Sequence, residues 1–237
     1  CIGLEEFDLS HICEIGEYAF ENCARFRKAE FAEDVRIMPH AFEDCGRLEE
    51  ICLGGRQSGF SLQEYAFSGC TFLRRVYYEG KKWEFGAYED ILSERIPEIV
   101  RLIFHSALSC FIVDQESILR GYRGAGSVIK IPWGIRRIAA EVFRDSMMLE
   151  EITIPESVEH IGARAFHGTT WMDRQRLKSP FVAVNHMLLD GSCCVGEVVV
   201  PEEINLVCGW AFANGMGIER IRFMSERTRV EEYAFRN

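Results

Sequence analysis

The sequence lacks the features that define several large classes of protein. It has only six prolines and 20 glycines among 237 residues, too few for a collagen-like or linker-like chain. No apolar run approaches the roughly 20 residues that a membrane-spanning helix requires. Acidic residues outnumber basic ones by 37 to 27, which gives a net charge of −10. This charge argues against a nucleic-acid partner, because phosphate binding needs clustered Lys and Arg.

The sequence motifs of common enzymes are missing as well. The chain has no glycine-rich phosphate loop, no G-x-S-x-G, no H-E-x-x-H and no Cys-x-x-Cys, so it carries no signature of nucleotide, hydrolase or zinc chemistry. Paired carboxylates do recur, as in Glu49-Glu50, but the equivalent place also holds Arg74-Arg75. A position that changes sign is a solvated strand entrance rather than an acid–base pair. We therefore expect no catalytic residue, no cofactor and no metal ligand.

The dominant feature that is present is an internal repeat. The dipeptide Ala-Phe occurs six times, and Val142-Phe143 is a variant copy of it. We call the phenylalanines of these dipeptides the anchors. Successive anchors are separated by 22 to 25 residues, except at two longer gaps of 76 and 46 residues. Both gaps are close to multiples of the period, so degenerate copies are expected inside them. The anchors are Phe20, Phe42, Phe67, Phe143, Phe166, Phe212 and Phe235.

Each repeat reads as a short strand followed by a turn. The clearest copy runs Leu149-Glu150-Glu151-Ile152-Thr153-Ile154-Pro155 and continues through Ile161-Gly162 to Ala165-Phe166. The alternation in Ile-Thr-Ile is typical of a strand with one buried face, and the proline ends it. A unit of this length cannot bury its apolar face alone, whereas stacked units can. The sequence therefore predicts an α/β or mostly β repeat fold, a solenoid of short strands and turns with a few short helices.

The frame L-x-x-I-x-I-P-x-x-V-x-x-I-G-x-x-A-F-x-x-C resembles the BspA-type (Treponema pallidum-type) leucine-rich repeat over nearly the whole chain. The resemblance implies a leucine-rich-repeat solenoid in an extracellular or cell-surface protein of bacterial type. It also implies a non-catalytic module for protein–protein interaction or adhesion, with a host or neighbouring-cell protein as partner. Two alternatives stay open: a structural spacer or scaffold that presents another domain, and a carbohydrate-binding accessory module with a glycan as ligand.

Two segments are predicted to be β-hairpin insertions in the solenoid. They span residues 111–126 and 181–196, and each contains an apolar pair that leads to a glycine. They resemble the strand-turn-strand insertion of the same family. A third irregular segment, Val76–Gly80 with Trp83 and Leu102–His105, resembles the family's terminal V-Y-Y-x-G…W…I-x variant.

Short helices and two blocks of repeats complete the expected organisation. We expect one helix around Glu89–Arg95, ended by Pro97, and another over Trp171–Leu177. Residues 1–105 form a first run of repeats and residues 106–237 a second, in one continuous solenoid because no linker separates them. The chain opens and closes at the same phase of the repeat, so we expect it to continue beyond at least one end or to pair there with another molecule.

The ten cysteines are expected to serve packing. Cys1, Cys23, Cys45 and Cys70 hold one place in the repeat, and later repeats carry Ser146, Thr169 and Gly215 there. A place that accepts these residue types selects for small size, which predicts buried free thiols. Disulfides between neighbouring repeats and a redox role for the vicinal pair Cys193-Cys194 are the alternatives.

The strands offer a candidate binding face. The middle residue of each strand points away from the core, which gives a row formed by Asp8, Glu30, Cys52, Tyr77, Lys130, Thr153, Val199 and Arg222. Tyr77 and Tyr78, beside Trp83, are the expected aromatic anchor for a partner. The candidate site residues are therefore Asp8, Glu30, Tyr77, Tyr78, Trp83, Lys130, Thr153 and Arg222. An ordinary solvated sheet face is the simpler interpretation, and the hairpin insertions are a second candidate surface.

Overall fold

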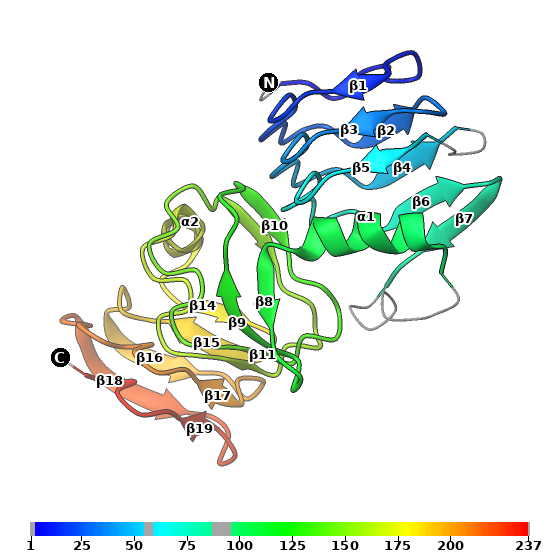
Figure 1. The fold of residues 1–237 in the computed structure, drawn as a ribbon. Coiled ribbons are helices and arrows are strands. Elements are labelled where there is room, and N and C mark those ends of the chain that lie inside the picture. The colour runs from blue at the N-terminus through cyan, green and yellow to red at the C-terminus, as the bar shows by residue number, and fades with distance from the viewer. Residues whose placement is uncertain (1–2, 55–58, 87–95, 237) are drawn as a thin grey trace. The chain divides into compact units, whose positions relative to one another are not determined.

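The computed structural model describes residues 3–54, 59–86 and 96–236. Its contacts divide the chain into two compact units. Unit 1 comprises Cys1–Ile112, Tyr122–Gly134 and Glu151–Pro155, and unit 2 comprises Val113–Gly121, Ile135–Glu150 and Glu156–Asn237. Within each unit the repeats form stacked coils, so the chain has the predicted leucine-rich-repeat fold (Figure 1). We use the word coil for one repeat with its short strands and its anchor turn.

Unit 1 contains parallel ladders in which each coil contributes short strands. One sheet has the order β2-β4-β6-β7 and another the order β1-β3-β5 (Figure 1). The strands are β1 (Glu14–Ile15), β2 (Lys28–Phe31), β3 (Arg36–Ile37), β4 (Glu50–Leu53), β5 (Ser61–Leu62), β6 (Arg75–Tyr78), β7 (Lys81–Glu84), β10 (Val128–Lys130) and β12 (Glu151–Thr153). All pairs are parallel except β6–β7, and β10 pairs with β12.

Unit 2 repeats this plan. Its parallel pairs are β9–β11, β11–β13, β15–β17, β17–β19 and β16–β18. The strands are β9 (Ile118–Tyr122), β11 (Arg137–Ile138), β13 (His160–Ile161), β14 (Val182–Val184), β15 (Met187–Asp190), β16 (Gly196–Val200), β17 (Leu206–Val207), β18 (Ile218–Phe223) and β19 (Arg229–Val230). β8 (Phe111–Val113) precedes β9, and the antiparallel pair β14–β15 is the second predicted hairpin. Both insertions are thus confirmed as strand-turn-strand elements.

The anchors form the core of each unit. Phe20 and Phe42 stack with ring centroids 5.0 Å apart and planes 2° from parallel, and Phe42 and Phe67 stack at 5.2 Å. In unit 2, Phe143 and Phe166 stack at 5.3 Å. The N–H groups of four anchors also donate to the carbonyl of the alanine before the next anchor, as from Phe42 to Ala66 at 2.7 Å. The Ala-Phe repeat is therefore both a hydrophobic ladder and a hydrogen-bond ladder.

The backbone around each anchor explains two further places in the repeat. The residue two positions after the anchor has a positive φ, and it is Asn22, Asp44, Gly69, Asp145, Gly168 or Asn214. These residue types tolerate the left-handed region best. The residue two positions before the anchor has a positive φ as well, and it is Tyr18, His40, Tyr65, Glu141, Arg164, Trp210 or Tyr233. Large side chains are therefore held at this second place on a sharply turned backbone.

The helices differ in part from expectation. α2 (Thr170–Lys178) confirms the second predicted helix, and Thr169 caps it by accepting the Met172 N–H. The Glu89–Arg95 segment lies outside the described residues. Pro97 does not end a helix; it precedes α1 (Glu98–Leu108), which contains Leu102–His105. Apolar side chains at Val100, Ile103, Phe104 and Ala107 are buried at helical spacing, and a proline is readily placed where a helix begins. None of the helices in the described ranges is long and apolar enough to cross a bilayer.

Three of the four repeated cysteines are buried and form no disulfide, as predicted: Cys23, Cys45 and Cys70. Cys1 lies outside the described residues. The Cys45 thiol donates to the Phe20 carbonyl at 3.0 Å and the Cys70 thiol to the Phe42 carbonyl at 3.1 Å. Thr169 donates to the Phe166 carbonyl at 2.8 Å. At Cys45, Cys70 and Thr169 the small side chain at this place thus also donates to an anchor carbonyl, which size alone did not reveal.

Thiol labelling should separate two classes of cysteine. Cys13 and Cys193 are exposed, whereas Cys45, Cys70, Cys110 and others are buried. Burial raises the pKa of Cys110 to about 12, and the thiolate is the reactive form. We expect an aromatic disulfide reagent at neutral pH to react quickly with Cys13 and Cys193. The double variant Cys13→Ser/Cys193→Ser should lose most of the fast phase, and denaturant should restore full labelling. A fast phase of undiminished amplitude in the variant would contradict this assignment.

Asp44 ties a distant segment to the coils of unit 1. Its Oδ2 accepts the Ala125 N–H at 3.0 Å, and the residue is only 6% exposed. A Cβ at Gly69 would lie 2.2 Å from Asp44 Oδ1, so glycine is required there by space as well as by its positive φ. Burial raises the pKa of the Asp44 carboxyl to about 6. The buried charge therefore opposes folding at neutral pH.

This carboxyl predicts a specific pH dependence. Because its pKa is higher in the folded chain than in the unfolded chain, the folded state gains a proton first as the pH falls through about 6. The free energy of unfolding should therefore rise between pH 7 and pH 4, by at most about 3 kcal/mol from this group. Asp44→Asn should remove that rise. Urea titrations of both proteins across this range test it, and equal pH profiles would contradict it.

Candidate functional site

The predicted row of middle strand residues is found in three separate pairings. Glu30, Cys52 and Tyr77 are aligned across β2, β4 and β6. Lys130 is aligned with Thr153 in unit 1, and Val199 with Arg222 in unit 2. Asp8 lies just before an isolated bridge between Leu9 and Phe31, and its carboxylate accepts from the Ser10 N–H at 2.9 Å. The row is thus composed of short local ladders.

The three aromatic residues expected to act together are divided between two faces. In the antiparallel β6–β7 pair, Trp83 lies opposite the fully buried Val76, and Tyr77 lies opposite Lys82. Paired residues share a face, and alternate residues on one strand do as well. Tyr78 and Trp83 therefore pack against the core, and Tyr77 is the one member of this group on the outer face. The three rings therefore do not share one face, because the hairpin turns Trp83 inward.

A second set of aromatic side chains in unit 1 is arranged more favourably. Tyr18, His40 and Tyr65, which we call the aromatic column, lie two positions before successive anchors. The rings of Tyr18 and His40 are 5.0 Å apart and 10° from parallel. Those of His40 and Tyr65 are 5.5 Å apart and 15° from parallel. Tyr18 is 47% exposed and Tyr65 is 43% exposed. The column is therefore an ordered and accessible aromatic surface.

Sequence analysis did not identify the aromatic column, although a signal was present. The position two residues before the anchor carries an aromatic ring in five of the seven coils that have an anchor. This position falls in the turn of the repeat, whereas the predicted partner surfaces were the strand row and the hairpin insertions. A turn whose backbone has a positive φ holds its side chain in one direction, so recurring large residues in a turn are themselves informative.

The same position in unit 2 gives a different cluster. The Arg164 guanidinium carbon lies 3.5 Å from the centre of the Trp210 ring, and the rings of Trp210 and Tyr233 are 6.0 Å apart. The Arg236 guanidinium carbon lies 5.3 Å from Trp210 and 5.2 Å from Tyr233. These are cation–π distances. Tyr, Trp and Arg are the side chains that most often carry binding energy at interfaces.

One coil of unit 2 is shorter than the others. Leu188 is aligned with Val207 in the β15–β17 pair. The anchor Phe212 comes five residues after Val207, whereas its equivalent in the short coil, Gly191, comes only three residues after Leu188. Gly191 donates to the Ala211 carbonyl at 2.6 Å, as an anchor would. A Cβ on Gly191 would lie 2.4 Å from the Phe212 ring, so a phenylalanine cannot occupy this place. The short coil therefore lacks the turn in which the other coils hold a large side chain two positions before the anchor.

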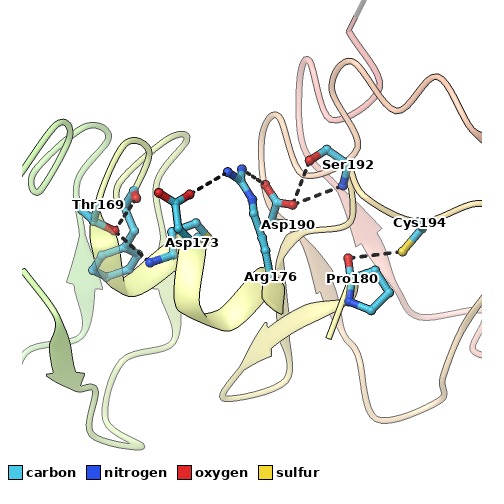
Figure 2. Close-up of polar contacts among 9 residues, drawn as sticks. Thr169, Asp173, Arg176, Pro180, Asp190, Ser192 and Cys194 are labelled. Carbon is cyan, nitrogen blue, oxygen red and sulfur yellow. Dashed lines mark hydrogen bonds and ion pairs between the residues drawn. The ribbon is translucent and has the colours of Figure 1, made fainter. Parts of the chain in front are cut away.

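A buried ion pair replaces the usual Ala-Phe contact in the short coil (Figure 2). Arg176 of α2 donates to Asp190 Oδ2 at 2.6 Å, and Ser192 donates to Asp190 Oδ1 through its N–H and its hydroxyl. Asp190 is 7% exposed. The hydrogen bond to Asp190 raises the pKa of Arg176 above its ordinary value. These contacts fasten α2 to the short coil. Within the described ranges, no group of three His, Cys, Asp or Glu could hold a metal ion.

A sequence comparison finds the same kind of repeat. The sequence model described as the BspA type leucine rich repeat region matches six copies over residues 1–89 and 125–237. Similar solved structures include a leucine-rich repeat protein from Bacteroides ovatus, with 17% identity over 92% of this chain and 55% of that one, at a TM-score of 0.26. A leucine-rich repeat protein from Eubacterium ventriosum has 15% identity over 92% and 58%, at 0.28.

A leucine-rich cell surface protein from Faecalibacterium prausnitzii has 13% identity over 96% of this chain and 75% of that one, at a TM-score of 0.30. The chain thus spans 55% and 58% of the Bacteroides and Eubacterium proteins. A search of curated proteins gave no match. Because the sequence model covers most of the chain, this chain belongs to the BspA-type leucine-rich repeat family.

Proposed function

We propose that the chain is a non-catalytic module that binds a protein partner through the aromatic column of unit 1. The observation that carries the proposal is the ordered stack of Tyr18, His40 and Tyr65 on the accessible side of the coils. A surface that is already ordered loses little side-chain entropy on binding, so more of the contact energy appears as affinity. Tyrosine is also among the residues enriched at binding hot spots.

A protein partner fits the column better than a glycan. A sugar ring that binds an aromatic residue covers the open face of its ring. In the column, the faces between Tyr18, His40 and Tyr65 are occupied by one another. Both faces of His40 and one face of each tyrosine are thus covered, and the ring edges and Tyr hydroxyls along the column suit the mixed polar and apolar surface of a protein. We therefore rank the carbohydrate-binding alternative below protein binding.

The family supports an extracellular or cell-surface location and a role in adhesion to a host or neighbouring cell. These points form part of the proposal and rest on membership of the BspA-type repeat family. Burial of Cys23, Cys45 and Cys70 keeps these thiols away from oxidants, so their free state is compatible with such a location.

The test is capture of a partner by the immobilised protein. Wild-type protein and the double variant Tyr18→Ser/Tyr65→Ser would be exposed to extracellular-matrix extracts and to bacterial surface extracts. We expect a saturable protein that wild type retains and the double variant loses. Retention of no protein by wild type would instead support the structural spacer. Equal retention by both proteins would reject the aromatic column as the binding surface.

A further inference from the structure

The short coil of unit 2 leaves a pocket of about 330 Å³. It lies between the anchor turn of the Phe166 coil and that of the Phe212 coil, with Met172 and Arg176 of α2 and Asp190 in its lining. A full coil would place its own turn there, and the short coil has two residues fewer. The pocket is therefore a consequence of the missing turn. Its volume is at the small end of the range for ligand sites.

Arg164 and Trp210 form one side of this pocket, and they lie on either side of the missing turn. In unit 1 the equivalent residues belong to adjacent coils and stack on each other. Here Arg164 extends past the short coil, and its guanidinium lies 3.5 Å from the centre of the Trp210 ring. No carboxylate in the described part of the chain forms an ion pair with Arg164. Its charge is thus stabilised by the Trp210 ring and not by a carboxylate, and its N–H donors can bind an acceptor at the pocket.

The other polar groups of the lining also favour an acceptor ligand. The Asp190 carboxylate already accepts from Arg176 and twice from Ser192. The nearby Glu231 carboxylate is engaged by His160 and by the Gly209 N–H. Both acids near the pocket thus have their partners. The lining also offers donors from the side chains of Arg164, His167 and Asn214, from the Trp210 indole N–H and from the unsatisfied Nε of Arg176.

Apolar side chains make up much of the rest of the lining. They come from the Phe166 anchor, from Met172 on α2, from Leu189 on β15 and from Ala213. Phe166 and Met172 are buried among their neighbours, so the wall they form is preformed. A ligand that fills the pocket gains most if it has a compact apolar body on this wall and an anionic acceptor at Arg164.

We propose that this pocket binds a carboxylate attached to a compact apolar or aromatic group. The carboxylate accepts from Arg164, and the apolar group packs on Phe166, Met172 and Leu189. Two sources offer this chemistry: a free organic acid and the carboxyl-terminal residue of a peptide. The inference does not depend on the aromatic column, because all of these residues belong to unit 2.

Isothermal titration with four probes tests the proposal. Phenylacetate and N-acetylglycyl-phenylalanine carry the carboxylate, and phenylacetamide and the peptide amide are their neutral counterparts. We expect at least one carboxylate to bind at millimolar concentration or better and its amide to bind about tenfold or more weakly. Tighter binding of the peptide identifies a carboxyl terminus as the source, and tighter binding of phenylacetate identifies a free acid. Equal binding of acid and amide, or no binding of any probe, would overturn the proposal.

Two variants locate the binding. Arg164→Gln should weaken the bound carboxylate about tenfold or more, whereas Arg137→Gln, at an exposed arginine on β11 of the same unit, should not. Cys193→Phe leaves Arg164 unchanged but places a ring at the pocket lining, so it should also weaken binding of the carboxylate by filling part of the pocket. Cys13→Phe, at an exposed cysteine of unit 1, is its control. Unchanged affinity in Arg164→Gln or in Cys193→Phe would overturn the assignment.

Failure of this proposal can be told apart from failure of the proposed function. The double variant Tyr18→Ser/Tyr65→Ser should bind the carboxylate probes as wild type does, because it alters unit 1 only. Loss of probe binding in that variant would contradict a site confined to unit 2.

Discussion

Replacement of Phe42 by alanine is expected to lower the free energy of unfolding of unit 1 by about 3–5 kcal/mol. Phe42 is fully buried and stacks on Phe20 at 5.0 Å and on Phe67 at 5.2 Å. It also contacts the ring of Phe31, edge-on, at 5.6 Å. Removing the ring leaves a cavity in the middle of the ladder, and the coils on both sides lose a contact. Urea unfolding followed by circular dichroism measures the change.

Phe235→Ala is the matched control, because Phe235 holds the anchor place of the last described coil. It stacks on Phe212 at 5.2 Å and is 46% exposed. The same chemical change there should cost less than about 1.5 kcal/mol, since half of the ring is already in water. Equal losses at Phe42 and Phe235 would show that the ladder does not hold the coils together.

Replacement of Arg176 by alanine is expected to cost about 2–4 kcal/mol of stability in unit 2. Arg176 is the cationic partner of Asp190, whose side chain is only 10% exposed (Figure 2). Without the guanidinium the buried carboxylate keeps only its contacts with Ser192. An unpaired buried charge is costly, so α2 should detach from the short coil before the rest of the unit unfolds.

Arg174→Ala on the same helix supplies the control for the ion pair. Arg174 pairs with Glu150 at 3.0 Å, but both side chains are 47% exposed. Exposed pairs contribute little, so the variant should lose less than about 1 kcal/mol. Hydrogen exchange of the α2 amides distinguishes the two variants. Equal protection of α2 in Arg174→Ala and Arg176→Ala would contradict a structural role for the buried pair.

The repeat could be predicted well because its signals are local and periodic. The anchors, the strands that precede them and the small side chain three residues after them all recur at a fixed spacing, and the structure stacks them as expected. The hairpin insertions were identifiable because apolar pairs and glycines interrupt that spacing. Because each repeat packs on a neighbouring repeat of the same kind, the local pattern of one repeat determines the architecture of the whole solenoid. A single sequence was therefore sufficient to predict the fold.

Features that depend on register between coils could not be predicted in the same way. The inward orientation of Trp83 follows from its pairing with Val76, and the stacking of Tyr18 on His40 follows from a positive φ in both coils. The short coil at Gly191 becomes visible only when Leu188 is aligned with Val207. Helix α1 was not predicted because Leu102–His105 was matched to the family's terminal repeat variant, and its helical spacing becomes visible only when Val100 and Ala107 are included.

The most direct test of the account is the affinity of a captured protein partner for three forms of the chain. The account predicts that Tyr18→Ser/Tyr65→Ser weakens the complex about tenfold or more, because the variant removes two rings of the aromatic column. It also predicts that Tyr77→Ser, on the outer face of the β6 strand, leaves the affinity close to that of wild type. Unchanged affinity in the double variant, together with weaker binding by Tyr77→Ser, would contradict the account. It would indicate that the partner binds the row of middle strand residues instead.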